Sequence, residues 1–279
     1  MAGEEIEDIS TKLGIDRTTG GRAVVSGHIL GRRNDIFAAT EQGPRFLYQY
    51  FDGRFVDRAV EFGVDDARQN GRGTALADIL YDGRLGIIIG NWNGYHRAYV
   101  PARHSFLDYA TEAFREPSLV RTVISADFDN DGFDEIFFNN IGQPNRMFRV
   151  RDGGILEPVA LSAALEADGL GTGAAVADMD GDGVLDLLVA HGESAPQPLS
   201  LFRAAIDGPG RYLRIAPLTG QGAPARGATV ILETDMRVHA KTIDAGSGYL
   251  CQMEPVAHYG LRDGETVKSV KVRWTDGTE

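Results

Sequence analysis

The stretch DMDGDGVLDLLVAHGES, residues 178–194, gathers acidic side chains into a short loop and then continues as an apolar strand. Counted from Asp178 as position 1, carboxylates stand at positions 1, 3, 5 and 9, namely Asp178, Asp180, Asp182 and Asp186. Gly183 occupies position 6, where a tight loop needs a residue that tolerates unusual backbone angles. Taken alone, the stretch fits a metal site, a catalytic acid cluster or a solvated turn.

The same pattern recurs along the chain. Equivalent apolar strands begin at or just after residues 35, 86, 135 and 186, so the intervals are 51, 49 and 51 residues. Each unit contains a strand before the loop, a second strand, a polar break and a third strand, and a fourth short strand follows in at least the first unit. Short antiparallel strands with a repeat of about 40 to 50 residues are typical of β-propeller blades.

The fold predicted from this repeat is all-β. We expect a partial or small β-propeller of about four blades over residues 17–207. Apolar runs that are short, rich in Ile, Val and Phe and bounded by turn residues argue against a helical solenoid. After the breaker IDGPG at 206–210, the alternation changes register, with Val270, Val272 and Trp274 on one predicted face. Residues 211–279 are therefore predicted to form either a separate small β-domain or a cap on the propeller.

Composition narrows the classes of partner. The 279 residues carry a formal net charge of -12, and no basic stripe offsets it, so a nucleic acid is not expected as a partner. No run approaches the roughly 18 apolar residues that cross a bilayer, so we expect no membrane insertion. The N-terminus lacks an apolar signal region, and no signal peptide is predicted in this chain. Cys251 is the single cysteine, which excludes an internal disulfide.

A second loop repeats the acidic pattern in the third unit. Its carboxylates are Asp127, Asp129, Asp131 and Glu135. Position 7 is Phe133 in this loop and Val184 in the loop from Asp178, and both offer only a backbone carbonyl. Alternating oxygens on a sharply turned loop form a cage suited to Ca²⁺, whereas Mg²⁺ keeps more of its water. Two Ca²⁺ sites are therefore predicted.

The loops are not EF-hands. An EF-hand needs Glu at position 12, which is Phe138 in one loop and Val189 in the other. The other two units have lost ligands: the second retains Asp78 and Asp82, and the first retains only Asp35, beside Arg32 and Arg33. We expect no metal in the first unit and weak or no binding in the second. In the first unit, an arginine is expected to replace the cation.

These loops, together with the strands EIFFNN at 135–140 and DLLVAHGES at 186–194, resemble FG-GAP (VCBS) repeats. The tail, with ARGATVIL at 225–232 and VKVRWTDG at 270–277, resembles the ASPIC/UnbV domain. Together with RTVISADFDNDG at 121–132, they give nearly the whole chain a resemblance to the cartilage acidic protein family.

The resemblance implies a secreted or periplasmic calcium-binding protein with a seven-bladed propeller and a C-terminal ASPIC/UnbV domain. It also implies roles in the extracellular matrix and in cell-surface adhesion or interaction. Carried over residue by residue, the calcium ligands are the eight carboxylates named above. With about four blades, the chain resembles the C-terminal part of a family member. Its open blade edges predict either an open arc or self-association.

Two functions of different class are compatible with the sequence. The first is an interaction protein whose propeller loops are stabilised by Ca²⁺, with an unidentified protein or glycan partner. The alternative is a lectin-like propeller in which Trp92, Tyr95 and His96 bind carbohydrate, although burial within the blade is favoured for Trp92. No enzyme is predicted, because the G-x-S-x-G nucleophile motif is absent and the acidic residues are committed to the calcium cages.

Overall fold

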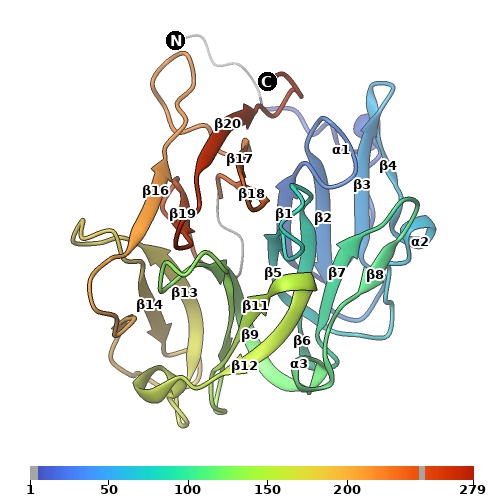
Figure 1. The fold of residues 1–279 in the computed structure, drawn as a ribbon. Helices are drawn as coiled ribbons and strands as arrows, with labels where there is room; N and C mark the ends of the chain where they lie inside the picture. Colours follow the sequence, from blue (N-terminus) through green and yellow to red (C-terminus); the bar gives the residue numbers. More distant parts are fainter. Residues whose placement is uncertain (1–5, 245–248) are drawn as a thin grey trace.

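The structure is a computed structural model that describes residues 6–244 and 249–279. Four antiparallel groups of strands, here called blades 1 to 4, follow one another along the chain and curve around a common centre (Figure 1). A short parallel pairing joins blades 2 and 3 into one eight-stranded sheet. Within each blade, strands that are consecutive in the sequence are hydrogen-bonded neighbours. This arrangement confirms the all-β, propeller-like class predicted from the repeat.

The strands of the four blades are short. Blade 1 contains β1 (Gly21–Gly27), β2 (Asp35–Thr40), β3 (Phe46–Phe51) and β4 (Arg54–Asp57). Blade 2 contains β5 (Gly71–Ala77), β6 (Gly86–Gly94), β7 (Arg97–Pro101) and β8 (Phe106–Asp108). Blade 3 contains β9 (Ser118–Ala126), β10 (Glu135–Asn140), β11 (Arg146–Arg151) and β12 (Ile155–Val159). In the described residues, blade 4 contains β13 (Gly171–Ala177), β14 (Asp186–His191) and β15 (Ser200–Arg203). The fourth strand is thus present in blades 1, 2 and 3.

The described helices are single turns between strands. They are α1 (Ser10–Leu13), α2 (Ala59–Phe62), α3 (Glu112–Arg115) and the 3₁₀ turns η1 (Asp152–Gly154) and η2 (Ser162–Leu165). Two of them contribute to the core: Ala59 of α2 is buried beside blade 1, and Phe114 of α3 is fully buried between blades 2 and 3.

The register of the first two strands is the same in all four blades. The last residue of the first strand faces the first residue of the second strand, in the pairs Gly27–Asp35, Ala77–Gly86, Ala126–Glu135 and Ala177–Asp186. The loop between them covers residues 28–34, 78–85, 127–134 and 178–185, so it is one residue shorter in blade 1. The repeat read from the sequence is therefore a repeat of hydrogen-bonded structure.

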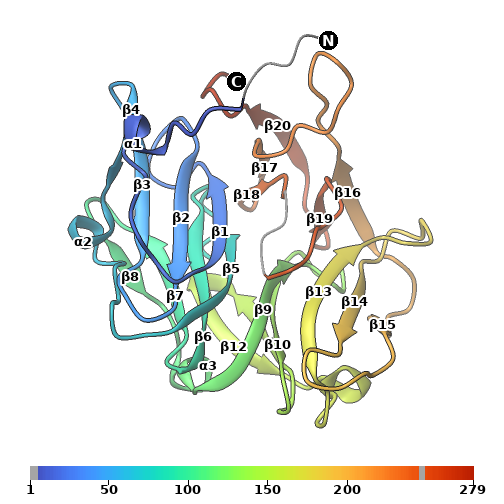
Figure 2. The ribbon, with the colours of Figure 1, turned by 180° about the vertical axis from the view of Figure 1, so that it is seen from behind.

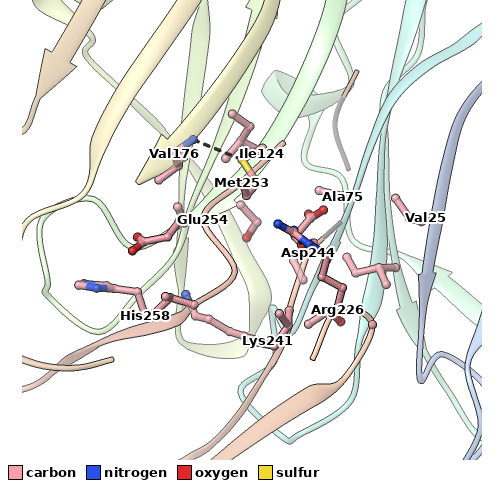
Figure 3. A pocket seen from close by; sticks show the side chains of 18 of the residues that line it. Val25, Ala75, Ile124, Val176, Arg226, Lys241, Asp244, Met253, Glu254 and His258 are labelled. Carbon is pink, nitrogen blue, oxygen red and sulfur yellow. Dashed lines mark hydrogen bonds between the residues drawn. The ribbon is translucent and has the colours of Figure 1, made fainter. Parts of the chain in front are cut away.

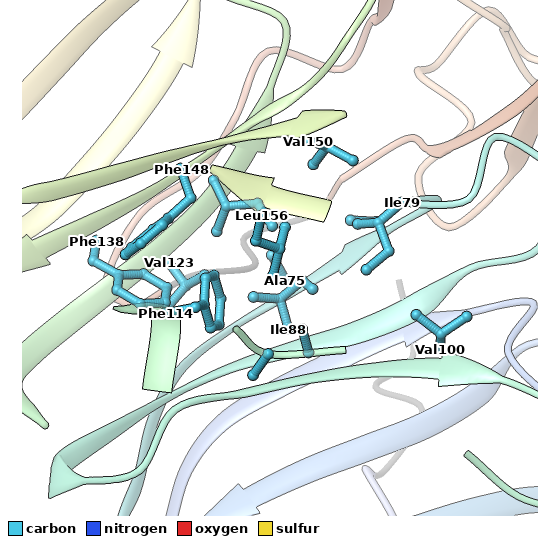
Figure 4. Packing of buried hydrophobic residues seen from close by; sticks show 14 of the residues in the cluster. Ala75, Ile79, Ile88, Val100, Phe114, Val123, Phe138, Phe148, Val150 and Leu156 are labelled. Atoms are coloured by element: carbon cyan, nitrogen blue, oxygen red, sulfur yellow. The ribbon is translucent and has the colours of Figure 1, made fainter. Parts of the chain in front are cut away.

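Apolar side chains from facing sheets fill the space between neighbouring blades. Between blades 2 and 3, the ring of Phe114 lies 5.0 Å from that of Phe138 and 4.8 Å from that of Phe148 (Figure 4). Burying one such side chain contributes roughly 1.5–3 kcal/mol. On the outward faces of the end blades, Val24 and Leu201 remain 60% and 58% exposed, because no further sheet covers them in the described residues.

The C-terminal residues form two small sheets with a core of their own. Strand β16 (Arg211–Ile215) pairs with β19 (Ala257–Leu261), and β17 (Thr229–Thr234) lies between β18 (Val238–Thr242) and β20 (Val267–Arg273). Val272 and Trp274 pack against this core, as expected, whereas Val270 on the edge strand β20 is 40% exposed. We call residues 211–279 the C-terminal domain.

The C-terminal domain lies against one end of the blades in both views (Figures 1 and 2). It closes a cavity of about 470 Å³ whose walls include Val25, Ala75, Ile124 and Val176, one residue from the innermost strand of each blade (Figure 3). The segment before β19 enters this space, where the N–H of Val176 donates to Met253 Sδ. The domain and the blades therefore form one packed unit.

Candidate calcium sites

Both acidic loops join the first and second strands of a blade at the end that contacts the C-terminal domain. Oxygens of Asp127, Asp129 and Glu135 lie within 4.8 Å of one another, and so do oxygens of Asp178, Asp180 and Asp182. Asp131 and Asp186 do not belong to these two tight groups, although both are part of the same loops. Each predicted cage therefore brings together three carboxylates in the described structure.

The two loops share one backbone conformation. The carboxylate at position 3 accepts the N–H of position 5, in the pairs Asp129–Asp131 and Asp180–Asp182, at 3.2 Å. The carboxylate at position 5 accepts the N–H of Phe133 or Val184 at 2.9 Å. The glycine at position 6 has a φ of 85° in one loop and 86° in the other, which disfavours any residue with a Cβ. Sequence spacing therefore corresponds to a defined turn in both blades.

Asp127, at position 1 of the blade 3 loop, is 1% exposed. Its Oδ2 accepts the N–H groups of Gly132 and Gly260, each at 3.0 Å. Its Oδ1 is buried and has no hydrogen-bond partner. Burial raises the pKa of Asp127 to about 7, and burial together with the charge of Asp129 raises the pKa of Glu135 to about 8. An unpaired buried acceptor among carboxylates fits a cation, because leaving it unpaired costs free energy.

An arginine on the third strand contacts each acidic set, which the sequence analysis did not predict. Arg149 Nε lies 2.5 Å from Glu135 Oε1, and its guanidinium also pairs with Asp129 and, at 3.5 Å, with Asp131. The corresponding residue in blade 4, Arg203, pairs with Asp180, Asp182 and Asp186 at 2.5, 2.9 and 3.0 Å. In both blades the arginine faces the position-9 acid across a hairpin.

The two acidic sets differ in exposure. At positions 3 and 5, the side chains of Asp129 and Asp131 are 21% and 32% exposed, whereas those of Asp180 and Asp182 are 51% and 40% exposed. Both oxygens of Asp178 already accept hydrogen bonds, from Gly181 to Oδ1 and from Gly183 to Oδ2. The loop of blade 3 is thus the more enclosed of the two sites.

The loops of blades 1 and 2 do not form a comparable group among the described residues. In blade 1, Asp35 Oδ2 accepts the N–H groups of Leu30 and Gly31, and Arg33 lies over the ring of Tyr50. No ion pair of Asp35 with Arg32 or Arg33 is present in this described loop, so the expectation that an arginine replaces the cation there is wrong. Backbone amides of its own loop, rather than an arginine, satisfy the Asp35 carboxylate.

In blade 2, Asp78 Oδ2 accepts the N–H groups of Gly83 and Ala240, at 2.7 and 3.0 Å. Asp82 pairs instead with Arg84 at 2.5 Å, and its side chain is 35% exposed. The two remaining acids of this loop are therefore used in local contacts with backbone and arginine.

The candidate carbohydrate platform is not one exposed surface. Trp92 lies between two guanidinium groups, 4.3 Å from that of Arg121 and 5.3 Å from that of Arg72. His96 is fully buried and its Nε2 lies 3.0 Å from Ser118 Oγ, while Tyr95 is 55% exposed. Of the three residues, only Tyr95 offers most of its surface to a ligand, so this structure gives the lectin-like alternative little support.

In the described part of the chain, no helix has the length and apolar character needed to span a membrane.

Comparison with known proteins identifies relatives of the chain. Residues 105–189 match the FG-GAP-like repeat family, and residues 219–279 match the ASPIC and UnbV family. Over 98% of its length the chain is 50% identical to cartilage acidic protein 1 of Homo sapiens, and 48% identical to the proteins of the same name from Xenopus tropicalis and Mus musculus. It spans 43 to 44% of the length of these relatives. The chain belongs to the cartilage acidic protein family.

Proposed function

We propose that this chain is a calcium-binding interaction protein of the extracellular type, in which Ca²⁺ stabilises the acidic propeller loops. The observation that carries the proposal is the buried Asp127 Oδ1, which has no hydrogen-bond partner and lies among other carboxylates. The matching turn in blade 4 and the FG-GAP-like match support it. A hard cation with oxygen ligands satisfies these groups best.

Charge balance gives a second argument. In blade 3 the four predicted ligand carboxylates, those of Asp127, Asp129, Asp131 and Glu135, are accompanied by two guanidinium groups, those of Arg149 and, at 3.7 Å from Asp131, Arg151, so the formal charge of this group is -4 + 2 = -2. One Ca²⁺ ion would bring it to 0. In our proposal these four carboxylates and the Phe133 carbonyl hold the first ion, and Asp178, Asp180, Asp182, Asp186 and the Val184 carbonyl hold the second.

The extracellular setting and the partner are inferred from the relatives. The relatives are named cartilage acidic proteins, and we propose that this chain shares an extracellular location with them. Extracellular calcium modules bind Ca²⁺ with dissociation constants of about 10⁻⁴ to 10⁻³ M. In a module of this kind the ions are constitutive parts of the fold. The proposal assigns binding of a protein or glycan partner, rather than catalysis, to the chain.

Calorimetric titration tests the proposal. Ca²⁺ titrated into the wild-type chain should bind, whereas the double variant Asp129→Asn and Asp180→Asn should lose binding at both loops, because each loses a central ligand charge. Asp168→Asn, which changes an exposed carboxylate in the connection between blades 3 and 4, is the matched control and should bind like the wild type. Equal affinities of the double variant and the wild type would refute the proposed cages.

A further inference from the structure

The C-terminal domain contacts the same position of all four loops. Position 1, directly after the first strand of each blade, is His28, Asp78, Asp127 or Asp178. The four contacts are His28 with Thr229, Asp78 with the N–H of Ala240, Asp127 with the N–H of Gly260, and Asp178 with the guanidinium of Arg214. We call the four loops together the loop face. A repeated position of the blades thus binds a domain that has no such repeat.

In the loop of blade 3, one carboxylate serves both the ion site and the domain. Asp127 Oδ2 accepts the N–H of Gly260, which belongs to β19, while Oδ1 is the unpaired oxygen of the candidate site. Gly260 is close-packed here: a Cβ at this position would overlap Asp127 Oδ2 and the backbone of Asn130. Displacing β19 would therefore displace a ligand of the ion.

Asn130, at position 4 of the same loop, joins three parts of the molecule. Its Nδ2 donates to the carbonyl of Gly183 in the blade 4 loop at 2.8 Å, and to that of Pro209 at 2.7 Å. Its Oδ1 lies 2.6 Å from His258 Nε2 in the C-terminal domain. Asn130 is 5% exposed and has a φ of 59°. The side chain of Asn130 therefore connects both acidic loops, the segment 206–210 and the C-terminal domain.

A buried arginine of the domain adds a third connection. Arg237 donates to the carbonyls of Gly132, at position 6 of the loop, and of Gly260, and it pairs with Glu265 at 2.8 Å. Nearby, Lys241 Nζ lies 2.7 Å from Asp134 Oδ1. The backbone turn that positions the predicted ligands is thus held from the domain side as well.

We propose that calcium binding at the loop of blade 3 and docking of the C-terminal domain on the loop face are thermodynamically linked. This inference rests on the proposed calcium function. Because Asp127 and Asn130 contact the domain directly, the docked domain fixes the loop in its ion-binding conformation. By reciprocity, a bound ion must stabilise docking by the same factor.

Calorimetry on variants of the domain tests the linkage from one side. Gly260→Ala places a methyl group against Asp127 and should weaken Ca²⁺ binding by about five-fold or more, the lower end of typical coupling between sites. Gly220→Ala is the matched control, since a Cβ there meets no atom within 4 Å and the φ is ordinary. A second variant, Asn130→Gly, removes the connecting side chain, keeps a backbone that suits positive φ, and introduces the residue that blade 4 has at Gly181.

Amide hydrogen exchange on the whole chain tests the linkage from the other side. In the wild type, Ca²⁺ should slow hydrogen exchange of the Gly260 amide. The factor should be at least as large as the factor by which Gly260→Ala weakens Ca²⁺ binding. The amides of β17 inside the domain should exchange at the same rate with Ca²⁺ and with EGTA, since the domain core stays folded. Equal slowing in β17 would indicate stabilisation of the whole fold and would overturn the linkage.

The remaining outcomes separate the two proposals. The linkage is wrong if Gly260→Ala and Asn130→Gly bind Ca²⁺ as tightly as the wild type and the exchange rate of the Gly260 amide does not change with Ca²⁺. The calcium function then stands, because the wild type still binds the ion. If Gly260→Ala does not fold, Asn130→Gly and the exchange of the wild type decide the question. If the wild type binds no Ca²⁺, both proposals are overturned.

Discussion

Asp78 and Asp127 occupy position 1 of neighbouring loops, and both carboxyl groups are buried. Each accepts a backbone N–H from its own loop and one from the C-terminal domain. Asp78 differs because both of its oxygens accept hydrogen bonds, whereas Asp127 Oδ1 accepts none. The same position thus has a structural role in blade 2 and remains available to a cation in blade 3.

The buried Asp78 predicts a pH dependence of stability. Burial raises its pKa from 3.8 to about 7, so between these values the folded chain binds a proton more tightly than the unfolded chain. The contribution of Asp78 to the unfolding free energy should therefore decrease as the pH rises from about 4 to about 7, by at most about 1.4 kcal/mol per pH unit. In EGTA, the slope of the unfolding free energy against pH, measured by urea unfolding, should be more positive for Asp78→Asn than for the wild type.

The control for this experiment is Asp168→Asn, whose slope should equal that of the wild type because the side chain is exposed. Identical slopes for Asp78→Asn and the wild type would show that Asp78 titrates as an ordinary surface carboxylate.

At the scale of single residues, the sequence identified the acids of the two loops but not the arginines that pair with them. The acids at positions 1, 3, 5 and 9 follow from spacing alone. Arg149 lies 14 residues after Glu135, whereas Arg203 lies 17 residues after Asp186, so their equivalence is hidden in the sequence. It becomes visible only in the hairpin register, where each arginine faces the acid at position 9.

The hairpin of β10 and β11 carries both Glu135 and Arg149, so an acidic and a basic side chain face each other within one element. In EGTA, Arg149→Gln should lower the unfolding free energy by about 2 kcal/mol, since it removes charged hydrogen bonds to Glu135 and Asp129. In saturating Ca²⁺ the loss should be smaller, because the ion compensates the same carboxylates. Chemical denaturation under both conditions measures the difference.

Arg58→Gln, next to α2 and away from the acidic loops, is the control. Its side chain is 32% exposed and pairs with the exposed Glu61 at 2.6 Å, so its removal should cost less than about 1 kcal/mol in either buffer. An equal cost of Arg149→Gln with and without Ca²⁺ would contradict a charge-balancing role.

At the scale of elements, the repeat was readable because each blade buries the same alternating faces. The fourth strands of blades 2 and 3 were harder to predict, since β8 spans only Phe106–Asp108 and β12 contains Pro158. Phe114 was not identified as a core residue either, because α3 is a single turn and its burial depends on packing against Phe138 and Phe148. Short elements take their conformation from tertiary contacts that local patterns do not contain.

At the scale of the molecule, a cap on the propeller was one of the two arrangements predicted for the C-terminal domain, but the residues that form its contact with the loop face were not predicted. Asp127 and Gly260 are 133 residues apart, and glycine carries no side-chain signal that marks a contact. The domain was recognisable from its changed alternation, but its position depends on backbone amides aimed at loop carboxylates. Contacts of this kind depend on the folded backbone of both partners, so the order of residues in the sequence does not predict them.

The outward faces of blades 1 and 4 lead to a prediction about association. Val24 on β1 and Leu201 on β15 are largely exposed, on faces turned away from the neighbouring blade. Uncovered apolar sheet faces favour association, so we expect the wild-type chain to self-associate with increasing concentration in sedimentation velocity. Val24→Lys combined with Leu201→Lys should shift the distribution toward the monomer, because lysines would have to be desolvated in the contact. Leu107→Lys, at an exposed position of β8, should leave it unchanged, and a wild type that stays monomeric at every concentration would show that these faces do not bind each other.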